Sequence, residues 1–113
     1  MISSAFAPGD VVALDFPFSD GVDSKNRPAL VLMGPSDLGD YTVAMISRAQ
    51  QGDGVAIGQA DFASGTLKSD SFVRVRHVYT CVSGVFVLKR GSLKPAAMQR
   101  VLKVLCPALG CRA

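Results

Sequence analysis

Short apolar runs separated by turn-forming segments occupy most of the chain, and they restrict the fold more than any other feature. The runs are rich in the β-branched and aromatic residues typical of strands, and they cover residues 10–16, 27–34, 41–50, 71–81 and 84–91. A segment broken by glycines holds a further short strand around Val55–Ile57. The intervening segments contain Gly, Pro, Asp, Asn and Ser, which favour turns. Strands that follow one another without helices between them predict an antiparallel sheet.

The hydrophobic pattern changes its period near the C-terminal end. Apolar residues there recur at helical spacing and form one stripe, consisting of Ala97, Met98, Val101, Leu102 and Leu105. Pro95 suits the first helical position, Pro107 predicts the end of the helix, and Ser92 is a candidate for its N-cap. The expected fold is mainly β (α+β), a small antiparallel barrel or curled sheet closed by a C-terminal helix.

Length and composition indicate a single domain over residues 1–113. The chain has 113 residues, of which 49% are hydrophobic, which fits one ordered globular domain with a modest core. No apolar run approaches the roughly 18 residues that span a bilayer. The N-terminus has neither the basic start nor the long apolar core of a signal peptide. We therefore expect a cytoplasmic protein without a membrane partner.

The cysteines Cys81, Cys106 and Cys111 do not follow a metal-binding pattern. Structural zinc sites draw their ligands from closely spaced cysteine pairs, which this chain lacks. A zinc site made by the three cysteines and His77 is the alternative. We expect reduced thiols that pack as small hydrophobic residues, with no metal and no cofactor.

Charge is distributed unevenly along the chain. Residues 1–66 carry eight Asp against three basic residues, a net charge of −5, and residues 67–113 carry nine basic residues against one Asp, a net charge of +8; the halves sum to +3. Such asymmetry favours a basic face and a polyanionic partner. The alternative is that folding mixes the halves and cancels the field.

A trial register places a guanidinium beside a hydroxyl. If the turn after the second run centres near Asp37, paired residues sum to about 74, and Arg27 lies opposite Ser47 on one face. Pro28 holds Arg27 in an extended conformation. The polar loop before it, residues 17–26, contains Asp23, Ser24 and Lys25, which can fold over the pair.

This pair suits the cleavage of RNA by its own 2′-OH group. That reaction needs a base, a cation for the charge on phosphorus and an acid for the leaving oxygen. The planar fork of Arg27 fits two phosphate oxygens, and Ser47 can hydrogen-bond another. An Asp serves as base if burial raises its pKa. The alternatives are a surface salt bridge for Arg27 and an ordinary strand-end hydroxyl for Ser47.

Three segments in order resemble the MazF/PemK family of toxin–antitoxin toxins. They are Gly9–Asp10 before an apolar run, the strand Arg27–Leu32, and Leu67–Val75, and the resemblance covers about residues 8–105. It implies a small SH3-like or CcdB-like barrel that forms a homodimer. It also implies a metal-independent, sequence-selective endoribonuclease that cleaves single-stranded RNA to a 2′,3′-cyclic phosphate, and a cognate antitoxin that neutralises it.

The resemblance assigns roles to individual residues. The catalytic arginine of the family falls on Arg27, its catalytic threonine on Ser47, and an acidic loop residue on Asp23. An arginine of a later strand falls on Arg74. In the PemK branch an aspartate two residues further on acts as base, but this chain has Arg76 there. The base is then Asp23 or His77, and a weakened or inactive nuclease is the alternative.

The remaining candidate residues contact RNA. Arg74 and Arg76 are candidates for binding the phosphate backbone, or they form the solvated face of a half-buried strand. Lys25 and Ser24 are loop contacts, and Phe18 is a candidate on which a base can stack. Two other function classes stay open. One is a toxin of the same fold that binds a protein, as gyrase poisons do, and the other is an RNA-binding module without chemistry.

Overall fold

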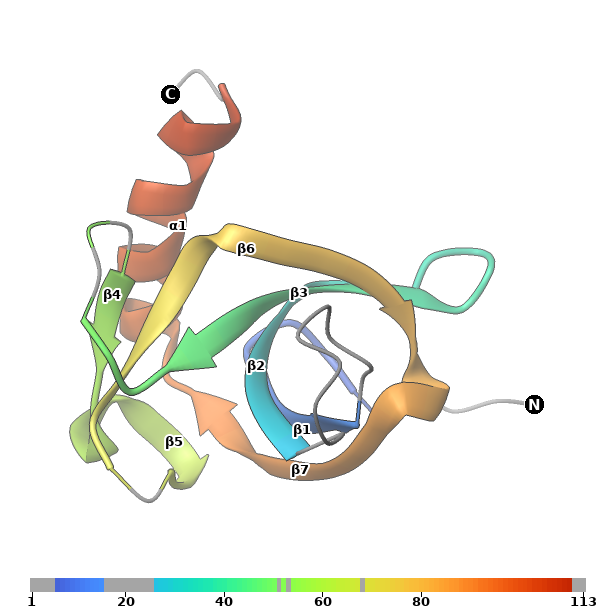
Figure 1. Ribbon diagram of the computed structural model, residues 1–113, viewed down its shortest axis with the longest axis horizontal. Coiled ribbons are helices and arrows are strands. Elements are labelled where there is room, and N and C mark those ends of the chain that lie inside the picture. The colour runs from blue at the N-terminus through green and yellow to red at the C-terminus, as the bar shows by residue number, and fades with distance from the viewer. Residues whose placement is uncertain (1–5, 16–25, 51, 53, 68, 111–113) are drawn as a thin grey trace.

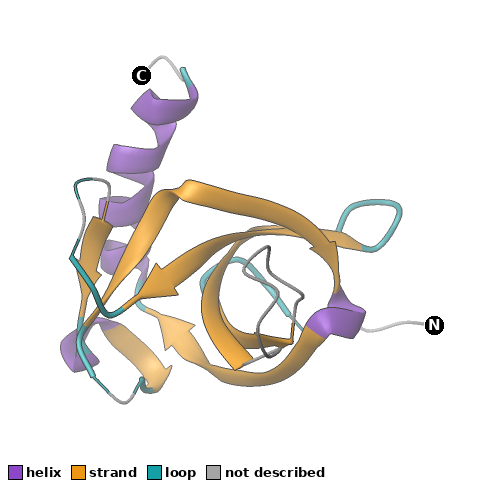
Figure 2. Ribbon diagram, viewed as in Figure 1, coloured by secondary structure: helices purple, strands orange, loops and turns teal. Residues whose placement is uncertain are grey.

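The computed structural model describes residues 6–15, 26–50, 52, 54–67 and 69–110, and all structural statements refer to these. Within them the chain forms one antiparallel sheet of seven strands in the order β4-β6-β3-β2-β1-β7-β5. The strands are β1 (Asp10–Asp15), β2 (Asn26–Met33), β3 (Asp40–Ser47), β4 (Gly54–Ile57), β5 (Phe62–Gly65), β6 (Ser71–Val82) and β7 (Phe86–Leu93). The helix α1 (Pro95–Leu109) follows the last strand, and two short 3-10 turns, η1 (Gln59–Asp61) and η2 (Ser83–Val85), complete the described elements (Figure 2).

The sheet is strongly curled. Strands β1, β2, β3, β6 and β7 wrap around a central space, while β4, β5 and α1 gather on one side of it (Figure 1). The predicted mainly β fold, a curled antiparallel sheet with a C-terminal helix, is confirmed.

The curl creates two hydrophobic cores, one on each face of the central strands. The inner core lies inside the curl and includes Val12, Leu14, Ala29, Val31, Val43, Met45, Cys81 and Phe86. The outer core lies between the sheet and α1, and includes Val11, Leu30, Ala44, Ile46, Val73, Val101 and Leu105. Strands buried on both faces read as continuous apolar runs, which explains the sequences VVAL and VAMI. Because neighbouring residues face different cores, the strand ends can carry polar groups on either face.

The β2–β3 hairpin has the predicted register over three pairs. Ala29 pairs with Met45, Leu30 with Ala44 and Val31 with Val43, and each pair sums to 74. Beyond Ala29 and Met45 the two strands no longer pair. β2 stays paired with β1 as far as Asn26, and β3 stays paired with β6 as far as Ser47. The sheet is therefore split between the start of β2 and the end of β3.

Several predicted boundaries were wrong at glycine residues. β5 was not predicted, and β7 continues past Gly91 to Leu93. A Cβ atom at Gly91 would overlap the carbonyl oxygen of Ser64, and one at Gly65 would overlap that of Arg90. These glycines let β5 and β7 approach closely, so Gly91 lies within its strand and does not end it.

The helix also differs from its prediction. Pro107 lies inside the last turn, where its missing N–H costs a single backbone bond, and α1 ends at Gly110 in the left-handed conformation with φ 87°. The Ser92 hydroxyl donates to Asp10 Oδ1 at 2.8 Å and does not cap the helix. Ala97, Val101 and Leu105 are buried as predicted, but Leu102 is exposed because it lies at the margin of the buried stripe.

Candidate active site

Arg27 and Ser47 flank the split in the sheet. Continuing the β2–β3 register two residues beyond Ala29 and Met45 places Arg27 across from Ser47. Both continue the rows of residues that face the inner core, because side chains alternate along a strand. The predicted register thus holds as far as Ala29 and Met45, the pair farthest from the turn. The two candidate residues lie just beyond this pair, where no ladder hydrogen bonds join β2 to β3.

Backbone structure fixes the position of Arg27. Arg27 is paired with Leu14 of β1, and Pro28 is paired with Ala13. Pro28 is the third residue of β2. It is tolerated there because the β2–β3 ladder begins only at the next residue, so no bond to β3 is lost.

The hydroxyl of Ser47 is oriented by the chain that follows. Ser47 Oγ accepts a hydrogen bond of 3.1 Å from the backbone N–H of Ala49. This bond uses a lone pair of the oxygen and leaves the hydroxyl proton available for donation. Ser47 can therefore donate to an anionic oxygen at the split. Directly across the ladder from Ser47 lies Phe72 of β6, a half-buried aromatic residue that the sequence pattern did not single out.

β6 carries a large bulge next to this position. Ala44 pairs with Val78 and Ile46 with Val73, so Met45 alone lies opposite Arg74–His77. Bulges bend a strand and redirect its side chains. The sequence pattern predicted strict alternation here, which would put Arg74 and His77 on opposite faces. Instead, Arg74 Nη2 lies 2.9 Å from His77 Nε2.

That contact engages one ring nitrogen of His77. A guanidinium can only donate, so Nε2 of His77 accepts in this arrangement. A lone pair that already accepts from Arg74 is not available to take a proton from a substrate. Arg76, in the same bulge, is exposed.

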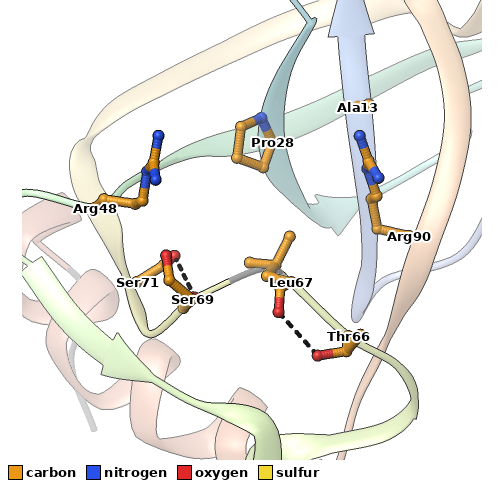
Figure 3. Close-up of a pocket in the computed structure, with 8 residues that line it drawn as sticks. All are labelled: Ala13, Pro28, Arg48, Thr66, Leu67, Ser69, Ser71 and Arg90. Carbon is orange, nitrogen blue, oxygen red and sulfur yellow. Dashed lines mark hydrogen bonds between the residues drawn. The ribbon is translucent and has the colours of Figure 1, made fainter.

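A pocket of about 330 Å³ opens on the outer-core side of the same strand ends (Figure 3). Its lining comes from β1, β2, the end of β3, residues 66–71 and β7, and consists of Ala13, Pro28, Arg48, Thr66, Leu67, Ser69, Ser71 and Arg90. Arg48 and Arg90 extend from opposite sides in the same direction, with Pro28 between them (Figure 3). Neither arginine was predicted, although Arg48 directly follows Ser47 in the sequence.

Four of the predicted site residues, Phe18, Asp23, Ser24 and Lys25, lie outside the described residues. Of the remaining four, the structure brings Arg27 and Ser47 to the split and places Arg74 and Arg76 in the β6 bulge. Among the described residues no group of three or more His, Cys, Asp or Glu side chains could hold a metal ion. No helix in this part of the chain is long and apolar enough to cross a membrane. Cys81 is buried and Cys106 is half-buried.

Comparison with known proteins identifies related sequences and structures. A profile of the family described as PemK-like, MazF-like toxin of type II toxin-antitoxin system matches residues 7–109. No curated protein sequence matches the chain.

Solved structures share the fold over nearly the whole chain. An endoribonuclease from Mycobacterial species has a TM-score of 0.75 at 19% identity, covering 100% of this chain and 99% of its own. An endoribonuclease in complex with its cognate antitoxin, also from Mycobacterial species, has a TM-score of 0.74 at 19% identity, covering 98% and 99%. A MazE–MazF complex from Deinococcus radiodurans has a TM-score of 0.70 at 20% identity, covering 97% and 100%.

Proposed function

The chain belongs to the PemK-like, MazF-like family of type II toxin–antitoxin toxins, and from this premise we propose that it is an endoribonuclease that cleaves single-stranded RNA without a metal. The observation that carries the proposal is the position of Arg27 and Ser47 on either side of the split in the sheet. Arg27, whose backbone is paired with β1, and the oriented hydroxyl of Ser47 flank that split, and a cation and a donor on its two sides suit the stabilisation of a phosphoryl transition state. Structural relatives named as endoribonucleases support the proposal.

In the proposed reaction, the 2′-oxygen of a ribose attacks the adjacent phosphorus. Its proton passes to a base, the bond between phosphorus and the 5′-oxygen breaks, and that oxygen takes up a proton. The products are a 2′,3′-cyclic phosphate and a 5′-hydroxyl. Arg27 stabilises the additional negative charge on the phosphorane oxygens, and Ser47 donates its free proton to one of them and so orients the scissile phosphate.

The base proposed is Asp23, which lies in the loop outside the described residues. His77 is the weaker candidate, because its Nε2 accepts from Arg74. Arg74, Arg76, Lys25 and Ser24 bind the RNA backbone in this proposal. Bases stack on Phe18, the usual mode of recognition for single strands.

The proposal extends to partners and assembly. A cognate antitoxin neutralises the protein, as the antitoxin complexes among its structural relatives support. The functional unit is a homodimer of one-domain chains that act on cytoplasmic RNA. Cleavage is selective for sequence.

The test is cleavage of a mixed-sequence RNA in the presence of EDTA by the wild-type protein and by Arg27→Ala. We expect cleavage that survives chelation, 5′-hydroxyl ends at the cut sites, and a loss of at least about 10²-fold in the variant. The matched control is Lys103→Ala, an exposed charge on α1, which should cleave like the wild type.

Two outcomes contradict the nuclease. RNA binding that falls with salt but yields no product would indicate a binding module without chemistry. No interaction with RNA, together with binding to a topoisomerase, would indicate a toxin that acts on a protein.

A further inference from the structure

We propose that the pocket between Arg48 and Arg90 binds a phosphate of the RNA next to the one that is cleaved. The inference rests on the proposed function, since it names a second position of the same substrate. It concerns the outer-core side of the split, whereas Arg27 and Ser47 belong to the inner-core side.

Backbone irregularities direct both arginines into the pocket. In the β1–β7 ladder Val11 pairs with Gly91 and Val12 with Lys89, so Arg90 is the extra residue of a bulge. Bulges redirect side chains, and here the guanidinium of Arg90 extends along one side of the pocket (Figure 3). Arg48 lies just past the last residue of β3, where the strand bends. Two unrelated departures from regular strand geometry thus converge on one pocket.

Within the part of the chain that the structure describes, acidic groups do not compensate the charge of the two arginines. Neither Arg48 nor Arg90 has an acidic partner among the described residues, whereas Arg100 and Lys89 are paired with Asp61 and Asp10. The two positive charges on one pocket repel each other, and an anion bound between them would offset that repulsion. A phosphate offers oxygens to both planar forks, which a single carboxylate serves less well.

The remaining walls are already shaped by internal bonds. Ser71 Oγ donates to the carbonyl of Ser69 at 3.0 Å, and Thr66 Oγ1 donates to the carbonyl of Leu67 at 2.9 Å (Figure 3). The backbone N–H of Thr66 also donates to the carbonyl of Arg90 at 3.3 Å, which ties this wall to the bulge. The wall is therefore formed without a ligand, and the arginines are left as the groups that bind one.

Size and position favour RNA over an acidic peptide. The volume of about 330 Å³ lies at the lower end of the range for small-ligand pockets, so the pocket holds one nucleotide-sized group. Ala13, Pro28 and Leu67 supply apolar surface for a sugar or base beside the phosphate. Arg48 follows Ser47 and Pro28 follows Arg27 in the sequence. An RNA strand bound at the split therefore reaches the pocket within a short length of its sugar–phosphate backbone.

The experiment measures binding of a single-stranded oligonucleotide with 2′-O-methyl groups throughout, which lacks the nucleophile and cannot be cleaved. Dissociation constants over a range of salt concentrations are compared for the wild type, Arg48→Gln, Arg90→Gln, the double variant with both substitutions, and the control Lys103→Gln. We expect each pocket variant to weaken binding several-fold and the pair together to reduce the slope of log K against log salt by about 0.7. On cleavable RNA, KM rises while kcat stays close to that of the wild type. Thermal unfolding shows that each variant is folded.

The outcomes separate this inference from the proposed function. In one outcome the wild type cleaves RNA, but both pocket variants bind the oligonucleotide with the affinity and salt slope of Lys103→Gln. This outcome would refute phosphate binding by the pocket and would leave the proposed nuclease function intact. In another outcome the pocket variants bind the oligonucleotide more weakly, but the wild type does not cleave RNA. This outcome would support phosphate binding by the pocket and would refute the proposed nuclease function. Absence of oligonucleotide binding by the wild type overturns the pocket. So does an oligo-aspartate peptide that binds more tightly than the oligonucleotide and depends on both arginines, because it assigns the pocket to a protein.

Discussion

The polar groups beside the split differ in the bonds that they already make. Ser47 Oγ accepts from a backbone N–H and keeps its proton for donation. His77 Nε2 accepts from Arg74 and has no lone pair left for a substrate on that nitrogen. These bonds distinguish the Ser47 hydroxyl, which can donate to a phosphate oxygen, from Nε2 of His77, which already accepts a hydrogen bond.

For Ser47 we predict that Ser47→Ala lowers kcat by about 10²-fold, because one hydrogen-bond donor to the developing charge is removed. Ser47→Thr keeps the hydroxyl and should retain activity within a few-fold. Single-turnover cleavage of a defined RNA measures both variants. Equal rates for Ser47→Ala and the wild type would exclude the hydroxyl from the reaction.

For His77 we predict that His77→Gln leaves the acid limb of the pH–rate profile at the same midpoint. The glutamine carbonyl can still accept from Arg74, whereas it cannot act as a base near neutral pH. Rates of cleavage across the pH range test this. Loss of the acid limb in His77→Gln would make His77 the base and would show that the Arg74 contact opens during the reaction.

At the scale of elements, α1 is joined to the β4–β5 connection by a bidentate ion pair. Arg100 Nη1 and Nη2 lie 3.2 and 3.0 Å from the carboxylate oxygens of Asp61, and Nη2 also donates to the carbonyl of Ala56 at 2.7 Å. The hydrogen bond from Arg100, followed by that from the backbone of Gly58, holds the pKa of Asp61 below its usual value of 3.8. This contact fixes the N-terminal half of the helix over the outer core.

The lowered pKa of Asp61 predicts how the stability of the fold depends on pH. The contribution is present above the unfolded-state pKa of 3.8 and is lost as the pH falls through the lower folded-state pKa. Arg100→Gln should cost less than about 1 kcal/mol near neutral pH, because the pair is partly exposed.

The difference between Arg100→Gln and the wild type should narrow below the unfolded-state pKa. Urea unfolding midpoints near neutral pH and in acid measure it, with Lys103→Gln as the control. If the unfolding midpoints of Arg100→Gln and the wild type differ by the same amount at both pH values, the ionised carboxylate of Asp61 is not the cause of the difference.

At the scale of the whole molecule, the sheet order explains how distant parts of the chain meet. β3 and β7 are separated in the sheet by β2 and β1, yet the curl brings the end of β3 and the bulge of β7 to one pocket (Figure 1). Asp10, which is buried, joins the start of β1 to β7 through Ser92 Oγ and Lys89 Nζ. These contacts join the start of β1 to β7. The split lies elsewhere in the sheet, between the start of β2 and the end of β3.

For the assembly we predict a homodimer, with a mass by light scattering of about twice the 11.8 kDa of one chain. Size-exclusion chromatography with light scattering over a range of concentrations measures it. A mass of one chain that does not change with concentration would refute the dimer.

Much of the hairpin that carries Arg27 and Ser47 could be predicted from the sequence. The turn residues between the apolar runs predicted a sum of 74, and the ladder has this sum from Ala29 to Val31, although the pair next to the turn, Met33 and Thr42, is shifted by one residue. The β6 bulge was not predicted, although the alternation of SFVRVRHVYTC changes phase at Arg76–His77, because a change of phase does not show how the partner strand continues. Arg90 was missed for the same reason, since a bulge in a ladder depends on both strands.

Local sequence was enough to predict six of the seven described strands, the helix, the β2–β3 register over three pairs and the family resemblance. These follow from local periodicity, turn chemistry and short-range order, which neighbouring residues encode. Three features became visible only in the folded chain: the split beside Arg27 and Ser47, the bond that His77 accepts from Arg74, and the pocket that Arg48 and Arg90 share. Those features arise from the curling of a sheet whose faces are both buried, a property of all its strands together.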